Sequence, residues 1–242
     1  MALLTAIMAL ALLLLSVVPV LAFPDVPTGH AYKDAIDQLS SRGIIGGYQS
    51  GEFGINDPVK RAQFAKMIVG ALRIAPGSST TTRFTDLGAP DANGYPHTYV
   101  QAAYDHGITT GTNAAQTLFA PWNSIRRDQV VSMIVRGANA LYPGVLESPP
   151  SGKMSLFDAV GEPHGHNLRT ADNNHLLDGL TGIGPGWDPT ATATRGEVAQ
   201  MLWALLGLIE GSTQPPPTTP PTTVPPSAPS DVWVYANGSG DY

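Results

Sequence analysis

The sequence predicts an all-α protein built from three helix–loop–helix units. Two observations lead to this prediction: one order of residues occurs three times along the chain, and the apolar residues of each copy follow helical spacing. A single pair of helices of about 12 residues buries too little apolar surface to be stable alone. We therefore expect the three pairs to pack together around one shared core.

The composition is that of an acidic, folded protein without cysteine. Hydrophobic residues make up 43% of the 242 residues, which is enough for a core, and the net charge is -6. This charge, without any dense run of Lys or Arg, argues against a nucleic-acid partner. The lack of cysteine excludes disulfides, thiol catalysis and cysteine-ligated metals. No phosphate loop or dinucleotide fingerprint occurs, so we expect no cofactor.

Residues 1–22 are predicted to be an export signal. Residues 1–18 carry no charged side chain, Pro19 then breaks the apolar run, and the small residue Ala22 stands at a cleavage position. We expect cleavage after Ala22, which leaves no membrane segment in the mature chain. An uncleaved anchor is the alternative, because about 20 apolar residues can span a bilayer.

The threefold pattern has recurring positions from start to end of each unit. Each unit opens with a phenylalanine and, one or two residues later, an aspartate: Phe23 and Asp25, Phe84 and Asp86, Phe157 and Asp158. A histidine then stands at the head of the first helical stretch: His30, His97 and His166. A glycine follows that stretch: Gly47, Gly111 and Gly179. An aromatic residue stands eight residues before the arginine that opens a second apolar helix: Phe53 and Arg61, Phe119 and Arg127, Trp187 and Arg195.

Helical periodicity is clearest in the first unit. Ile36 and Leu39 belong to one apolar stripe, and Phe64 and Leu72 belong to a second. Glycine favours the left-handed conformation that ends many helices, so Gly43 and the Gly46-Gly47 pair are expected to end the first helix. The other two units are predicted to repeat this arrangement.

The chain divides into the signal, the units and a tail. We predict unit 1 at residues 23–82, unit 2 at 83–150 and unit 3 at 151–210. Residues 211–230 are rich in Pro and Thr and predict an extended linker, because proline fixes φ and removes a backbone donor. Residues 231–242 alternate like a strand and are predicted to start a second domain, similar to the opening of β-helix domains of surface carbohydrate-active proteins.

The repeated motifs resemble the S-layer homology (SLH) domain of bacterial surface proteins. That family's unit opens F-x-D-V, continues to G-I-I-x-G and restarts at a T-R-A-E-like motif. The first unit matches with FPDV from Phe23, GIIGG from Gly43 and KRAQ from Lys60, and the third matches with TRGE from Thr194. The resemblance covers residues 23–210.

The resemblance implies a pseudo-threefold, three-pronged helical fold that binds secondary cell-wall polysaccharide without a covalent bond. In the family this ligand often ends in a pyruvate-ketal amino sugar. It lies in grooves between the prongs, against the motif arginine and the glycine turn. The implied ligand-binding residues are Arg61, Arg127, Arg195, Gly47, Gly111, Gly179, Asp25, Asp86 and Asp158.

The chemistry of these residue types agrees with an acidic glycan. A guanidinium can bind a carboxylate bidentately, and unpaired N–H groups at a helix start could bind the same anion. Each residue type also has a structural alternative. The arginines could be paired with the repeat aspartates, the glycines could be helix C-caps, and the aromatics are more consistent with core packing than with sugar stacking.

The three units differ at the helix start, which affects their ranking. Only Thr194 and Glu197 keep the capping box, whereas Lys60 and Arg126 replace the threonine in the other units. Asp178 precedes Gly179 and would repel a carboxylate. We therefore rank the grooves of Arg61 and Arg127 above that of Arg195.

The leading functional hypothesis is a non-catalytic anchor that holds an exported protein at the cell wall or S-layer. One alternative is that this anchor belongs to a surface carbohydrate-active enzyme whose catalytic β-helix lies beyond residue 242. Another is a helical-repeat scaffold for protein partners. The cluster His164, His166 and His175 could suggest a metal, but no carboxylate pattern accompanies it, so we predict none. The expected partner is peptidoglycan-linked glycan, and no oligomeric state is predicted.

Overall fold

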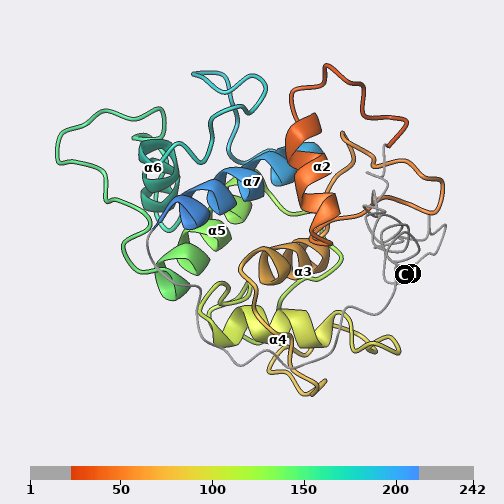
Figure 1. Ribbon diagram of the computed structural model, residues 1–242. Helices are drawn as coiled ribbons and strands as arrows, with labels where there is room; N and C mark the ends of the chain where they lie inside the picture. Colours follow the sequence, from red (N-terminus) through yellow and green to blue (C-terminus); the bar gives the residue numbers. More distant parts are fainter. Residues whose placement is uncertain (1–22, 213–242) are drawn as a thin grey trace, which may run out of the picture.

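The computed structural model describes residues 23–212 and is all-α over that range, as predicted (Figure 1). The described helices are α2 (Lys33–Ser41), α3 (Arg61–Ala71), α4 (His97–Asp105), α5 (Arg127–Leu141), α6 (Gly165–Asn173) and α7 (Arg195–Gly211). Each predicted unit thus contributes two helices, and the second always starts at the motif arginine. The predicted signal and nearly all of the predicted linker and tail lie outside the described residues, although α7 extends one residue past the expected boundary at 210.

The helices pair between units rather than within them. Helix α4 packs on α3, α6 packs on α5, and α2 packs on α7, while the two helices of one unit make no close backbone approach (Figure 1). Each prong of the fold therefore combines the first helix of one unit with the second helix of another. Helices α3, α5 and α7 also contact one another at the centre. The three units are consequently interlocked, and no unit can bury its apolar faces without the others.

A closed ring of backbone hydrogen bonds marks the pseudo-threefold centre. The N–H of Val59 donates to the carbonyl of Ala193 (3.1 Å), Ala193 donates to Ile125 (2.9 Å), and Ile125 donates to Val59 (2.8 Å). All three residues are fully buried. Buried backbone groups need partners, and here each unit satisfies one donor and one acceptor of its neighbours.

The starts of the long helices are capped by the neighbouring units. The N–H groups of Arg61 and of the next residue, Ala62, donate to carbonyls at Asn123 and Pro121, both at 3.0 Å. The starts of α5 and α7 are bound in the same way by loops of units 3 and 1. The expectation that an anion could use unpaired N–H groups there is therefore wrong for the first two positions of each helix, because the fold already uses them.

Smaller features of the first helices differ from unit to unit. Gly43 is left-handed after α2 (φ 68°), as expected, and Gly107 occupies this place after α4. His175 takes the same conformation after α6 (φ 59°), so glycine is not required there. His97 and His166 lie in the first turn of their helices, whereas His30 lies three residues before α2.

Within residues 23–212, no helix is both long and apolar enough to cross a membrane.

Candidate functional site

The three motif arginines share one local environment. Each guanidinium lies 4.5–4.9 Å from the ring centre of the aromatic residue that the next unit supplies: Arg61 over Phe119, Arg127 over Trp187 and Arg195 over Phe53. These aromatic side chains are buried in the core, which supports the packing alternative over an exposed sugar platform. Beyond this shared contact, the three arginines have very different partners.

Arg61 is buried but only partly hydrogen-bonded. Arg61 is only 5% exposed, and its Nε donates to the carbonyl of Phe119 at 2.8 Å. Its two terminal nitrogens have no hydrogen bond to another described residue. Burial lowers the pKa of Arg61 to about 10, while the nearby charge of Asp86 acts in the opposite direction. The guanidinium is therefore a buried cation with unused donors.

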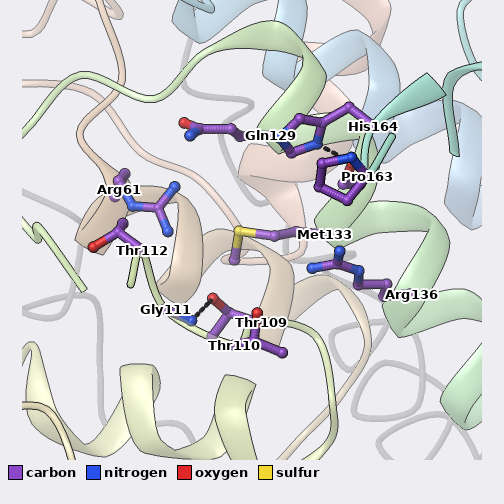
Figure 2. A pocket seen from close by; sticks show the side chains of 11 residues that line it. Arg61, Thr109, Thr110, Gly111, Thr112, Gln129, Met133, Arg136, Pro163 and His164 are labelled. Carbon is purple, nitrogen blue, oxygen red and sulfur yellow. Dashed lines mark hydrogen bonds between the residues drawn. The ribbon is translucent and has the colours of Figure 1, made fainter. Parts of the chain in front are cut away.

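These unused donors face a cleft of about 240 Å³ (Figure 2). The cleft is formed by α3, by the turn after α4, by α5 and by the segment before α6, so all three units contribute to it. Its lining residues are Arg61, Thr109, Thr110, Gly111, Thr112, Gln129, Ser132, Met133, Arg136, Pro163 and His164. No aspartate or glutamate is among them, so the cleft is a polar, positively charged site.

Arg127 is held in an ion pair. Its Nη2 lies 2.6 Å from Oε1 of Glu197, its Nε donates to Oε2 at 3.2 Å, and its Nη1 donates to the carbonyl of Asp188 at 3.1 Å. The Glu197 side chain is only 5% exposed. The structural alternative of an acid-paired arginine thus holds here, but the partner is a helix-start glutamate rather than a repeat aspartate.

Arg195 is enclosed by the first unit. The residue is 1% exposed, its Nε donates to the carbonyl of Phe53 at 2.7 Å, and its Nη2 donates to the carbonyl of Gly46. The ring of Tyr48 also lies 5.0 Å from its guanidinium carbon. This side chain joins units 1 and 3 and does not line the cleft of Arg61.

The third residue of the long helix in the following unit explains why Arg61 differs from Arg127. This residue is Gln129 of α5 for Arg61 and Glu197 of α7 for Arg127. Glu197 accepts from the N–H of Thr194 (2.9 Å) and also pairs with Arg127. In unit 2 the same position is Gln129, whose Oε1 accepts from the N–H of Arg126 (3.2 Å) and which lines the cleft of Arg61. An uncharged amide keeps the capping bond but gives Arg61 no counter-ion.

The three predicted aspartates stabilise loops. Asp25 accepts the N–H groups of Phe53 and Gly54, both at 2.7 Å, and Asp86 binds the corresponding groups at Phe119 and Ala120. Asp158 binds the N–H of Ser155 (3.0 Å). None of the three forms an ion pair with a motif arginine, and none lines the cleft. Asp86 nevertheless fixes the backbone whose carbonyl holds Arg61.

Packing requires two of the three predicted glycines, Gly47 and Gly111, and only Gly111 lines the Arg61 cleft. A Cβ at Gly47 would lie 2.6 Å from Phe23 and from the carbonyl of Glu52. Gly111 is left-handed (φ 82°), and a Cβ there would lie 2.5 Å from the carbonyl of Leu118. Gly179 is left-handed (φ 80°), which favours glycine, but a Cβ there would meet only the flexible end of the Gln200 side chain. Gly111 alone combines this close packing with a place in the cleft lining.

Sequence reasoning did not identify Arg136 and His164 as part of the site. Arg136 stands nine residues after Arg127, at the position that Gly70 and Ala204 occupy in the other units. A charged residue at a repeat position that is otherwise small is a signal that comparing the units could have revealed. His164 was considered only as a metal ligand, and within the described residues no group of three His, Asp or Glu side chains could hold a metal.

Comparisons with known proteins agree with the repeat motifs. The model of the S-layer homology domain matches residues 22–65. An S-layer protein of Bacillus licheniformis is 27% identical over 75% of this chain and 19% of its own length. S-layer protein EA1 of Bacillus anthracis is 26% identical over 75% of this chain and 20% of its own length. An endoglucanase of Bacillus sp. (strain KSM-635) is 29% identical over 76% of this chain and 18% of its own length.

The chain thus spans about a fifth of the length of these relatives. The family model covers residues 22–65, the larger part of unit 1, while units 2 and 3 repeat its pattern of positions in the sequence and its helix order in the structure. The relatives named as S-layer or cell-wall proteins locate such a chain at the bacterial surface. Residues 22–65 therefore match the S-layer homology domain, and the chain is similar over three quarters of its length to bacterial S-layer proteins.

Proposed function

We propose that residues 23–212 anchor an exported protein to the cell wall by binding an acidic secondary wall polysaccharide, and that the Arg61 cleft is the principal site. The observation that carries this proposal is the buried Arg61 guanidinium, whose terminal donors face a cleft without acidic residues. Burying a cation without a counter-ion is costly, so a bound anion gains a strong, charge-assisted interaction.

The size and chemistry of the cleft favour one acidic sugar. A volume of about 240 Å³ is below the roughly 300–1,000 Å³ of sites for drug-sized ligands, so it suits a single sugar unit at the end of a chain. A pyruvate ketal would present its carboxylate to the Arg61 fork, while the hydroxyls of Thr110 and Thr112 offer partners for sugar oxygens.

The residues described here are proposed to act as a non-catalytic module. A second candidate function is that the module anchors a larger surface enzyme, because relatives of this segment include proteins named endoglucanase and amylopullulanase. A scaffold for protein partners is the remaining alternative, and it predicts no binding to purified wall.

Sedimentation with cell wall tests the proposal. We expect the protein to sediment with peptidoglycan that carries its native polysaccharide and to remain in solution when the polysaccharide has been stripped. Arg61→Gln is expected to weaken sedimentation about tenfold or more, since it removes a charge-assisted interaction. Arg61→Lys, which keeps the charge but loses the planar fork, is expected to recover only part of it.

Arg83→Gln is the matched control, because Arg83 is an exposed arginine that does not line the cleft. Thermal unfolding of each variant would show that the fold is retained. Equal binding to stripped and native wall, or full binding by a folded Arg61→Gln variant, would contradict the proposed site.

A further inference from the structure

The wall of the cleft formed by α5 carries a second basic group. Arg136 is half-buried, and no hydrogen bond or ion pair joins its guanidinium to another described residue. Figure 2 shows this guanidinium turned toward Met133 and Thr109, inside the same cleft that Arg61 enters from α3. Two guanidinium groups therefore share one cleft whose lining contains no acidic residue.

His164 stands beside Arg136 and is embedded in a network of polar groups. Its Nδ1 lies 2.7 Å from Oγ of Ser132, which also accepts from the amide of Asn167 (3.2 Å). The charged groups that act on it are Asp128, Arg61 of α3, Arg136 of α5, and Arg126, which precedes α5. Asp128 is itself held by Arg126, with 2.6 Å between Oδ2 and Nη2.

This surrounding lowers the pKa of His164 and so favours the uncharged imidazole when the cleft holds no anion. Burial is the largest cause that lowers the pKa of His164, and the three arginines lower it further, while Asp128 acts in the opposite direction. An anion between Arg136 and His164 would reverse part of this effect. Such an anion would therefore favour proton uptake by the imidazole.

The basic pair occurs in this cleft alone among the three equivalent places. Gly70 and Ala204 replace Arg136 in the other units, as noted above. The residue that precedes the first helix is His164 in unit 3 but Tyr32 in unit 1 and Pro96 in unit 2. The pair is thus a property of this chain's Arg61 cleft and not of the repeated motif.

We infer that Arg136 and His164 form a second anion position, so that the Arg61 cleft binds a glycan end with two acidic groups. One group lies at Arg61 and the other between Arg136 and His164, because a single carboxylate at Arg61 leaves the Arg136 charge uncompensated. The second group is a carboxylate or a phosphate. The inference rests on the proposed function, and it adds the class of ligand and a protonation step coupled to binding.

Small anions of matched chemistry can test this inference directly. The probes are lactate with one carboxylate, tartrate with two, and inorganic phosphate, each titrated into the whole chain while the imidazole signals are followed by NMR. His164→Gln identifies the His164 signal. We expect tartrate to bind about tenfold or more tightly than lactate or phosphate, because its second carboxylate adds a second charge-assisted contact, whereas phosphate is a single group that fills one position.

Two variants separate the two positions. Arg136→Gln is expected to abolish the preference for the doubly charged probe while leaving lactate binding in place, and Arg61→Gln is expected to weaken every probe. In Arg61→Gln only the second position remains, so tighter binding of lactate than of phosphate to this variant would assign a carboxylate to that position, and the reverse order would assign a phosphate. Equal affinities for all three probes, or an unchanged preference in Arg136→Gln, would overturn the inference.

Proton coupling gives an independent readout. Carboxylate probes stay ionised above about pH 5.5, so tartrate affinity should rise between pH 7.5 and 5.5 only if the protein takes up a proton. We expect this rise in the natural chain and not in His164→Gln. A preference for tartrate without sedimentation on wall would contradict the proposed function alone, whereas sedimentation without any such preference would contradict this inference alone.

Discussion

Arg61 and Arg127 begin equivalent helices and lie over equivalent aromatic rings. The terminal nitrogens of Arg61 nevertheless face a cleft, whereas the guanidinium of Arg127 is paired with Glu197. The difference comes from one residue on the neighbouring unit, which is Gln129 beside Arg61 and Glu197 beside Arg127. Both residues cap their own helix through a side-chain oxygen that accepts from the N–H of the residue before the helix. The comparison teaches that, between these two arginines, the choice of amide or carboxylate in a capping residue separates a guanidinium that faces a cleft from one that is already neutralised. Arg195 follows another course, because its neighbouring cap is also an amide, Gln63, and carbonyls of unit 1 enclose it.

Replacing Gln129 by glutamate, the residue found beside Arg127, should have the largest effect on wall binding. Gln129→Glu would place a carboxylate beside Arg61, and we expect the new ion pair to compete with the glycan and to reduce wall binding about tenfold or more. Sedimentation with native wall measures this loss. Gln63→Glu is the matched control, since it makes the same change at the third position of α3, away from the cleft lining. Undiminished binding by a folded Gln129→Glu variant would show that Arg61 is not the anion site.

The reverse change, Glu197→Gln, should make the Arg127 guanidinium available to an anion and should lower the stability of the fold. Glu197→Gln keeps an acceptor for the Thr194 N–H but leaves the Arg127 guanidinium without its buried counter-ion. We expect the free energy of unfolding to fall by about 1–3 kcal/mol. Denaturant unfolding measures this loss, and lactate titration should reveal added anion binding that Arg127→Gln in the same background removes. A variant as stable as the natural chain would mean that the ion pair contributes nothing to the fold.

The repeat aspartates offer a test between a structural role and a ligand role. Asp86→Ala removes the acceptor for the N–H groups of Phe119 and Ala120, and we expect a loss of about 1–3 kcal/mol in unfolding free energy. Wall binding should weaken only as far as the displaced Phe119 carbonyl releases Arg61. Lost binding at unchanged stability would instead assign Asp86 to the ligand.

The smallest expected effect is the pH dependence of stability from His164. Its pKa in the folded chain is below the ordinary value of 6.5, so the unfolded chain binds the proton more readily. The stabilisation is therefore complete above about pH 6.5 and is lost as the pH falls through the lower, folded pKa. Denaturant unfolding at several pH values should show this decline, and His164→Gln should flatten it. An identical pH profile for the variant would assign the decline to other groups.

Much of the local structure could be predicted from the sequence. Helical periodicity located the two helices of each unit, and the motif arginine marks the first residue of α3, α5 and α7. The left-handed Gly43 after α2 followed from glycine's freedom at positive φ. The loss of the side-chain cap at Lys60 and Arg126 also followed from residue type, and only Thr194 accepts a bond from its own helix.

The helix partners could not be predicted in this way. Periodicity shows which face of a helix is apolar but not which helix covers that face. The packing of α2 on α7, from opposite ends of the described chain, depends on how loops of about 20 residues close, and no local pattern records this. The histidines illustrate a related difficulty, because His30 resembles His97 in the sequence yet lies outside its helix.

The sequence by itself determined that the chain is helical, triplicated and related to S-layer homology domains, because these properties depend on spacing and residue type along the chain. Only the tertiary structure decided which arginine could serve an anion. The partners of Arg61, Arg127 and Arg195 come from neighbouring units, so their burial and neutralisation depend on contacts between residues far apart in sequence. Interlocking of the units brought Glu197 to Arg127 and left Gln129, Arg136 and His164 around Arg61.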